Sequence, residues 1–117
     1  MKEVSTAIEY KDKKYTMVFN LNVMQEIQDE YGSLQRWGEL TDGKDGNGEP
    51  NVKALIFGLT EMLNEGIDIE NDETGSNIMP LTKKQVGRIL TEYGISQMNG
   101  TMNDLVIEST KIEQKNE

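Results

Sequence analysis

The first twenty residues alternate between polar and apolar side chains with a period of two. This spacing places side chains on one face of an extended strand. The residues that share a face are Val4, Thr6, Ile8 and Tyr10, then Tyr15, Met17 and Phe19. We therefore predict two strands, 4–10 and 15–19, joined as a hairpin by the polar four-residue loop Lys11-Asp12-Lys13-Lys14. Two strands alone are marginally stable in water, so their apolar face must pack on helices or on another subunit.

From residue 20 onward the apolar residues follow helical spacing. The first predicted helix begins after Asn20 or Asn22, either of which can cap it, and stops at Gly32. Its apolar positions are Leu21, Met24, Ile27 (or Gln28) and Tyr31. A short second helix follows Ser33 and carries Leu34, Trp37 and Leu40. Residues 41–50 are rich in Gly, Asp and Asn, which is typical of a loop.

The strongest helical pattern in the chain begins at Asn51. Its apolar stripe is continuous and consists of Val52, Leu55, Ile56, Leu59, Met62 and Leu63. We expect Gly66 to end this helix, because glycine is the commonest residue just after a helix. The polar stretch 67–79 is then expected to be a linker.

Two further helical segments complete the chain. Thr82 and Gln85 have the spacing of a capping box, and the helix they begin is expected to stop at Gly94. Its apolar residues are Val86, Ile89, Leu90 and Tyr93. The last amphipathic segment carries Met98, Met102, Leu105, Val106 and Ile112, with Asn99-Gly100-Thr101 assigned as a helix break or cap. We predict an α+β, mainly α fold: an N-terminal β-hairpin, four to five short helices, one domain over 1–112, and a flexible tail over 113–117.

Composition excludes several classes of function. The 117 residues contain no His and no Cys, which removes the commonest general base, thiol nucleophiles and the best transition-metal ligands. The net charge of −9, from 12 basic and 21 acidic residues, disfavours nucleic acid and anionic membranes as partners. There is no apolar run of membrane-spanning length and no pattern of a signal peptide, so we expect a cytoplasmic chain.

Two acidic segments could bind metal or act in acid–base catalysis. The loop Asp42–Glu49 resembles an EF-hand loop in composition, but Lys44 and Gly46, or Pro50 and Ile56, fall where ligands or the turn glycine are required. The second segment lies in the expected linker and is interpreted as solvated rather than catalytic. It contains Glu65, Asp68, Glu70, Asp72 and Glu73. We therefore expect no catalytic, metal-binding or cofactor-binding residues, and no enzyme activity.

Protein binding is the class of function that is left. Methionine is frequent, and it both fills irregular cores and lines adaptable binding surfaces. Met17, Met24 and Met62 lie on core-like stripes. For Met98 and Met102 both roles stay open, and together with Leu105 and Val106 they are the candidate partner-binding residues.

The order of these features resembles the tail assembly chaperones of long-tailed phages and prophages of Gram-positive bacteria. In that family a Tyr-x-Leu/Met-x-Phe strand precedes a helix ending in Glu-x-x-Tyr/Phe-Gly, then an apolar helix and a Leu-Thr-x-x-x-Val/Leu-Gly-x-Leu/Ile segment. The matching positions are Tyr15, Met17 and Phe19, then 26–32, 55–63 and 81–90. Gln28 departs from the glutamate of the pattern, and the loop 41–50 looks like an insertion.

The resemblance implies a chaperone in the host cytoplasm that is absent from the finished virion. Such a protein binds the tape measure protein, keeps it soluble, and recruits the tail tube protein as the tube assembles. Self-association is also expected, because a two-stranded hairpin leaves an unpaired edge. Two alternatives are a structural head–tail connector or tail-tube-associated virion protein, and a host adaptor that binds a basic partner through the acidic 65–73 segment.

Overall fold

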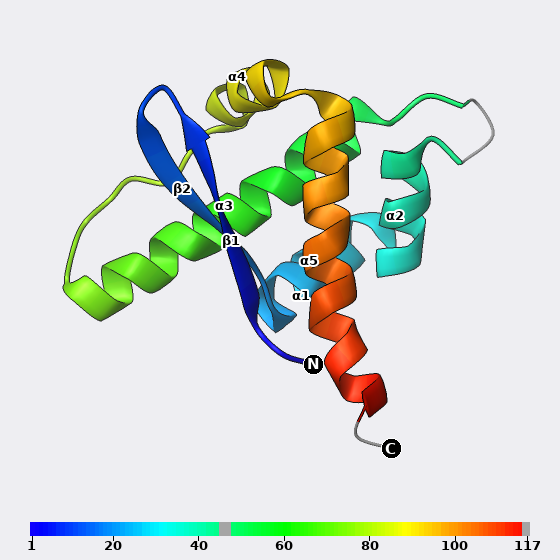
Figure 1. The fold of residues 1–117 in the computed structure, drawn as a ribbon, viewed down its shortest axis with the longest axis horizontal. Helices are drawn as coiled ribbons and strands as arrows, with labels where there is room; N and C mark the ends of the chain where they lie inside the picture. The colour runs from blue at the N-terminus through cyan, green and yellow to red at the C-terminus, as the bar shows by residue number, and fades with distance from the viewer. Residues whose placement is uncertain (45–47, 116–117) are drawn as a thin grey trace.

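A computed structural model describes residues 1–44 and 48–115, the side chains of 112–115 excepted. The fold is α+β and mainly helical, as predicted, with an antiparallel hairpin followed by five helices (Figure 1). The elements are β1 (Val4–Tyr10), β2 (Lys13–Phe19), α1 (Leu21–Tyr31), α2 (Leu34–Asp42), α3 (Val52–Thr74), α4 (Lys83–Tyr93) and α5 (Ile95–Lys115). The long helix α3 crosses behind the hairpin, and α5 runs beside the hairpin, to its right in this view.

The hairpin is closed by a two-residue turn rather than the four-residue loop expected. Tyr10 pairs with Lys13, so only Lys11 and Asp12 lie in the turn. Both have positive φ, 51° and 64°. These angles are those of a type I′ turn, whose twist matches the twist of the flanking strands. The expected loop was too long because the turn uses Lys-Asp in place of the usual glycine-containing pair.

The expectation that Gly66 ends the third helix is wrong. α3 continues for two more turns to Thr74 and ends at Gly75, which has a φ of 73°. Gly66 instead lies where α3 crosses β2, and a Cβ built there would be 2.2 Å from the carbonyl oxygen of Thr16. Glycine is required here for close approach and not for termination. The expected linker therefore begins at Gly75.

The helix starts follow the predicted caps. Asn20, rather than Asn22, caps α1 by accepting a hydrogen bond from the Val23 backbone N–H at 3.2 Å. Ser33 caps α2 in the same way, and Thr82 and Gln85 form the reciprocal capping box of α4. The apolar face of α1 is shifted from the expected one, since Val23 and Ile27 are buried whereas Leu21 is 67% exposed.

One hydrophobic core joins the hairpin to all five helices. Its members include Met17 and Phe19 of β2, Ile27 of α1, Trp37 of α2, Leu55, Leu59 and Leu63 of α3, Ile89 of α4, and Met98 of α5. A second glycine of α3 makes room for the single tryptophan. A Cβ at Gly58 would be 2.3 Å from the Trp37 ring, and the indole N–H donates a 2.9 Å hydrogen bond to the Ala54 carbonyl. Trp37 thereby fixes α2 against α3.

The last helix is continuous through Asn99-Gly100-Thr101, so the expected break there is wrong. The Asn99 amide donates hydrogen bonds to the Thr41 carbonyl and to Asp42, at 3.2 and 3.0 Å. It joins the second turn of α5 to the end of α2 instead of capping a helix. α5 also extends past residue 112 to Lys115, into the expected tail, and residues 116–117 lie outside the described part of the chain.

Candidate protein-binding site

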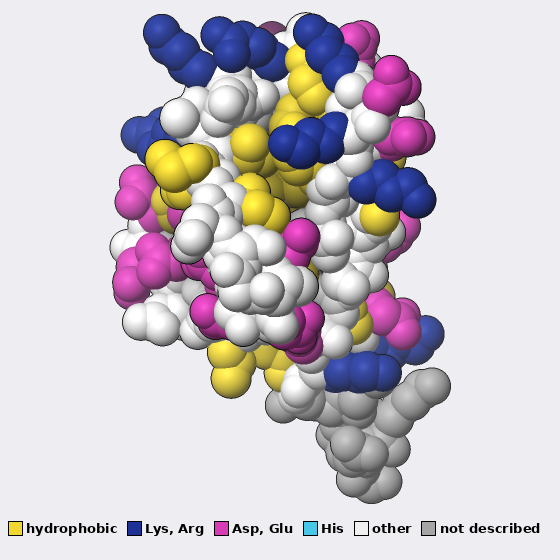
Figure 2. All heavy atoms as spheres, turned by 90° about the vertical axis from the view of Figure 1, so that its left-hand side faces the viewer, with side chains coloured by type: hydrophobic (Ala, Val, Ile, Leu, Met, Phe, Trp, Pro, Cys, Tyr) yellow, Lys and Arg dark blue, Asp and Glu magenta, His cyan; other side chains and the backbone are white. Residues whose placement is uncertain are grey.

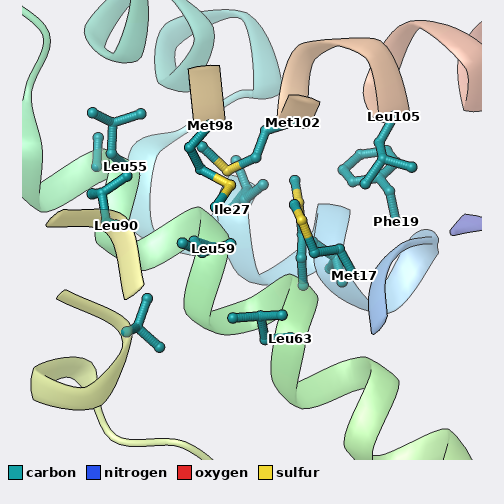
Figure 3. Packing of buried hydrophobic residues seen from close by; sticks show 14 of the residues in the cluster. Met17, Phe19, Ile27, Leu55, Leu59, Leu63, Leu90, Met98, Met102 and Leu105 are labelled. Carbon is teal, nitrogen blue, oxygen red and sulfur yellow. The ribbon is translucent and has the colours of Figure 1, made fainter. Parts of the chain in front are cut away.

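The four candidate partner-binding residues lie on the inner face of α5. Met98 and Met102 are fully buried, Leu105 is 6% exposed, and Val106 is half-buried against the same core. Figure 3 shows the two methionines reaching from α5 toward Ile27 and Leu59. These side chains therefore fill the core in this conformation. Their contact with a partner stays a prediction that would require α5 to move.

The exposed apolar side chains are other residues, and two of them, Ile95 and Ile107, lie on α5 itself. Among the described side chains, Met79, at 79%, is the most exposed of the large ones, and the others are Leu21, Val52, Ile78, Ile95 and Ile107. Two pairs among these share a groove: Val52 with Ile95, and Ile78 with Met79. Sequence reasoning assigned Val52 to the core stripe of α3 and did not single out Ile95.

The first groove lies between α3 and α4 and is called here the α3–α4 groove. It is open, has a volume of roughly 660 Å³, and is lined by Val52, Ile56, Gly87, Leu90, Thr91 and Ile95. Lys84 and Arg88 complete its lining, and both are exposed. The hydroxyl of Thr91 already donates a 2.8 Å hydrogen bond to the Gly87 carbonyl. The groove is thus an apolar surface with cations at its rim.

The second groove lies between β2, α3 and the segment 75–81. It is smaller, about 160 Å³, and its apolar lining comes from Tyr15, Ile67, Ile78, Met79 and Leu81. Two asparagines of α3 hold the segment in place. Asn71 exchanges both of its amide hydrogen bonds with the Ile78 backbone, and Asn64 does the same with Leu81, at 2.8 to 3.1 Å. The spacing of seven residues between the asparagines places them on one face of α3.

The basic residues gather at one end of the molecule despite the net charge of −9. Half of the 12 belong to the hairpin tip and α4: Lys11, Lys13, Lys14, Lys83, Lys84 and Arg88. Figure 2 shows Lys and Arg side chains on both sides of a hollow with hydrophobic side chains inside it, at the end that carries the hairpin tip and α4. This end therefore favours a partner that offers both apolar and acidic side chains.

The acidic segment that was expected to be a linker forms the second half of α3. Glu65 accepts hydrogen bonds from the side-chain amides of Asn20 and Asn22, at 2.8 and 3.0 Å, so it connects α3 to the start of α1. Burial raises the pKa of the neighbouring Glu61 carboxyl. The negative charges of Glu26 and Glu65 raise this pKa further, with Glu26 the larger of the two, and the positive charge of Lys83 lowers it. Glu65 thus has a structural role that the sequence pattern did not indicate.

Within the described residues, no group of three or more acidic, His or Cys side chains could hold a metal ion. Residues 45–47 of the tested calcium loop lie outside that part of the chain. No helix in the described ranges is both long and apolar enough to cross a membrane. Comparison with protein-family models, with curated proteins and with solved structures found no match.

Proposed function

We propose that this chain is a non-enzymatic tail assembly chaperone of a long-tailed phage or prophage. It binds the tape measure protein in the host cytoplasm and keeps it soluble while tail tube subunits assemble around it. It is itself absent from the mature virion. The proposal rests on the resemblance of four ordered segments, 15–19, 26–32, 55–63 and 81–90, to the pattern of that family.

One structural observation supports treating these segments as a single pattern. They form β2, α1, α3 and α4, and their apolar residues meet in the same core: Met17, Phe19, Ile27, Leu55, Leu59, Leu63, Val86, Ile89 and Leu90. The four matched segments thus belong to one hydrophobic core. The two apolar grooves add surface of the kind that a protein-binding chaperone needs.

The test is co-expression with the tape measure protein of the phage or prophage that encodes this chain. We expect the soluble fraction of the tape measure protein to rise, and the two proteins to co-purify. The matched control is an unrelated acidic protein of similar size, since negative charge alone can improve solubility. An unchanged soluble fraction would contradict the proposal.

Mass spectrometry of purified phage particles separates the chaperone from a structural component. A chaperone is released before the particle is complete, so its peptides should be missing from virions that contain the tape measure and tube proteins. Stoichiometric peptides of this chain in those virions would support a head–tail connector or tube-associated subunit instead.

A further inference from the structure

The lining of the α3–α4 groove includes a glycine that the packing of this chain does not require. Gly87 lies in the interior of α4, where glycine costs about 0.5–1 kcal/mol relative to alanine. Of the described residues, a Cβ at this position would meet only the Ile56 side chain, at 3.7 Å, which is an ordinary contact. Gly58 and Gly66, in contrast, are each in close approach to another part of the fold. The absent side chain at Gly87 therefore leaves the groove deeper without improving the fold.

The electrostatics of the groove are opposite to those of the whole chain. Lys84 and Arg88 line it, and none of its described lining residues carries a carboxylate. They are four residues apart on α4 and so lie on one side of that helix, along the groove. Glu92, one turn beyond Arg88, is exposed and does not line the groove.

We propose that the α3–α4 groove binds an amphipathic helix of a partner protein through its apolar face, with carboxylates of that helix paired to Lys84 and Arg88. A groove between two helices accepts a helix with apolar residues at i, i+3, i+4 and i+7. Val52, Ile56 and Ile95 supply the apolar contacts, and Gly87 admits a large side chain. This inference rests on the proposed function, because it identifies the chemistry of the segment that the chaperone binds.

The direct test uses two labelled synthetic helices with the same leucine stripe, one flanked by Glu and the other by Lys. Fluorescence anisotropy with the purified full chain should show that the Glu helix binds tighter by about tenfold, because two attractive pairs become repulsive when its charges are reversed. The net charge of −9 alone favours the Lys helix, so the two explanations predict opposite orders. Equal binding, absent binding, or preference for the Lys helix would overturn the proposal.

Two variants locate the binding. Gly87→Leu fills the groove and should lower the affinity for the Glu helix by about tenfold or more. Gly100→Leu is the matched control, because Gly100 is an exposed helical glycine and no described atom lies within 4 Å of an added Cβ. Circular dichroism confirms that both fold. If Gly87→Leu binds as wild type does, the groove is not the site.

A charge-reversal pair covers the case in which Gly87→Leu does not fold. The double variant Lys84→Glu with Arg88→Glu should bind the Lys helix more tightly than the Glu helix, which is the reverse of the order expected for wild type. Lys2→Glu with Lys111→Glu makes the same change in net charge on exposed residues outside the groove, and should leave the order unchanged. The same preference in both double variants would overturn the proposal.

Co-expression with the tape measure protein distinguishes failure of this inference from failure of the proposed function. If Gly87→Leu solubilises the tape measure protein as well as wild type does, the groove assignment is wrong and the chaperone function stands. If wild type binds the Glu helix but does not change the solubility of the tape measure protein, the proposed chaperone function is wrong and the assignment of the groove as a helix-binding site stands. A third outcome concerns self-association. If wild type forms a dimer that the Gly87→Leu substitution dissociates, and the Glu helix does not compete with dimer formation, the groove binds a second copy of this chain. That result would overturn the inference.

Discussion

Substitution of Gly66 tests how α3 is fixed to the hairpin. In Gly66→Ala the new methyl group would lie 2.2 Å from the Thr16 carbonyl oxygen, whereas ordinary contacts begin near 3.4 Å. The helix and β2 must therefore separate by about 1 Å, and the obstacle is backbone rather than a flexible side chain. Overpacking of this kind costs about 1–3 kcal/mol, and a rigid backbone obstacle places it at the upper end. Alanine recovers about 1 kcal/mol of helix propensity, so we expect a net loss of about 2 kcal/mol.

Urea unfolding followed by circular dichroism measures this loss. Gly100→Ala is the control, because it makes the same change of residue inside a helix with nothing within 4 Å. It should raise the free energy of unfolding by up to about 1 kcal/mol, which leaves about 3 kcal/mol between the two variants. If both variants are stabilised equally, α3 does not pack on β2 through Gly66, and the explanation of why the helix continues past it is refuted.

Three further substitutions test the packing and the ionisation described above. Gly58→Ala should displace the indole of Trp37, lower stability by about 1–3 kcal/mol and shift the emission of this single tryptophan to longer wavelength. Tyr31→Phe removes a buried hydroxyl that has no hydrogen-bond partner among the described residues, and it keeps the edge-on ring contact with Phe57. Thermal unfolding should show stabilisation by about 1 kcal/mol. Because the pKa of Glu61 is raised in the fold, its favourable contribution is present below the ordinary value of 4.5 and lost as the pH rises through the folded pKa. Glu61→Gln should therefore be more stable than wild type in urea titrations at about pH 7, and equal to it at about pH 4.

The predictions that succeeded depend on short-range chemistry. Caps at Ser33 and Thr82 need only a side-chain oxygen and an amide three residues away, so local sequence is sufficient to find them. The strand faces of the hairpin were likewise correct, because Ile8, Met17 and Phe19 share one side through the period of two alone.

The predictions that failed concern residues whose role depends on a distant contact. Gly66 has the local signature of a helix end, and only the crossing with β2 explains its presence inside α3. Asn99 likewise resembles a break until its bonds to the end of α2 are known. The α3–α4 groove was missed because Val52 and Ile95, 43 residues apart, become neighbours only when α4 folds back along α3. A stripe of apolar residues at helical spacing shows that one face of the helix is apolar. It does not show whether the rest of the fold covers that face.

The binding of an acidic helix by an acidic chain is physically consistent if charge is considered locally. At physiological ionic strength the Debye length is about 8 Å, so exposed charges farther away than this contribute little. The acidic half of α3 begins at Glu65, nine residues beyond Ile56, which is about 14 Å along the helix at 1.5 Å per residue. Lys84 and Arg88, in contrast, line the groove itself. Lowering the salt concentration lengthens the screening distance and lets the distant carboxylates oppose an acidic partner. The preference for the Glu helix over the Lys helix should therefore be larger at physiological salt than at about 0.01 M, where the Debye length is about 30 Å. A preference that grows steadily as salt is removed would show that the carboxylates of α3 have no influence at the groove.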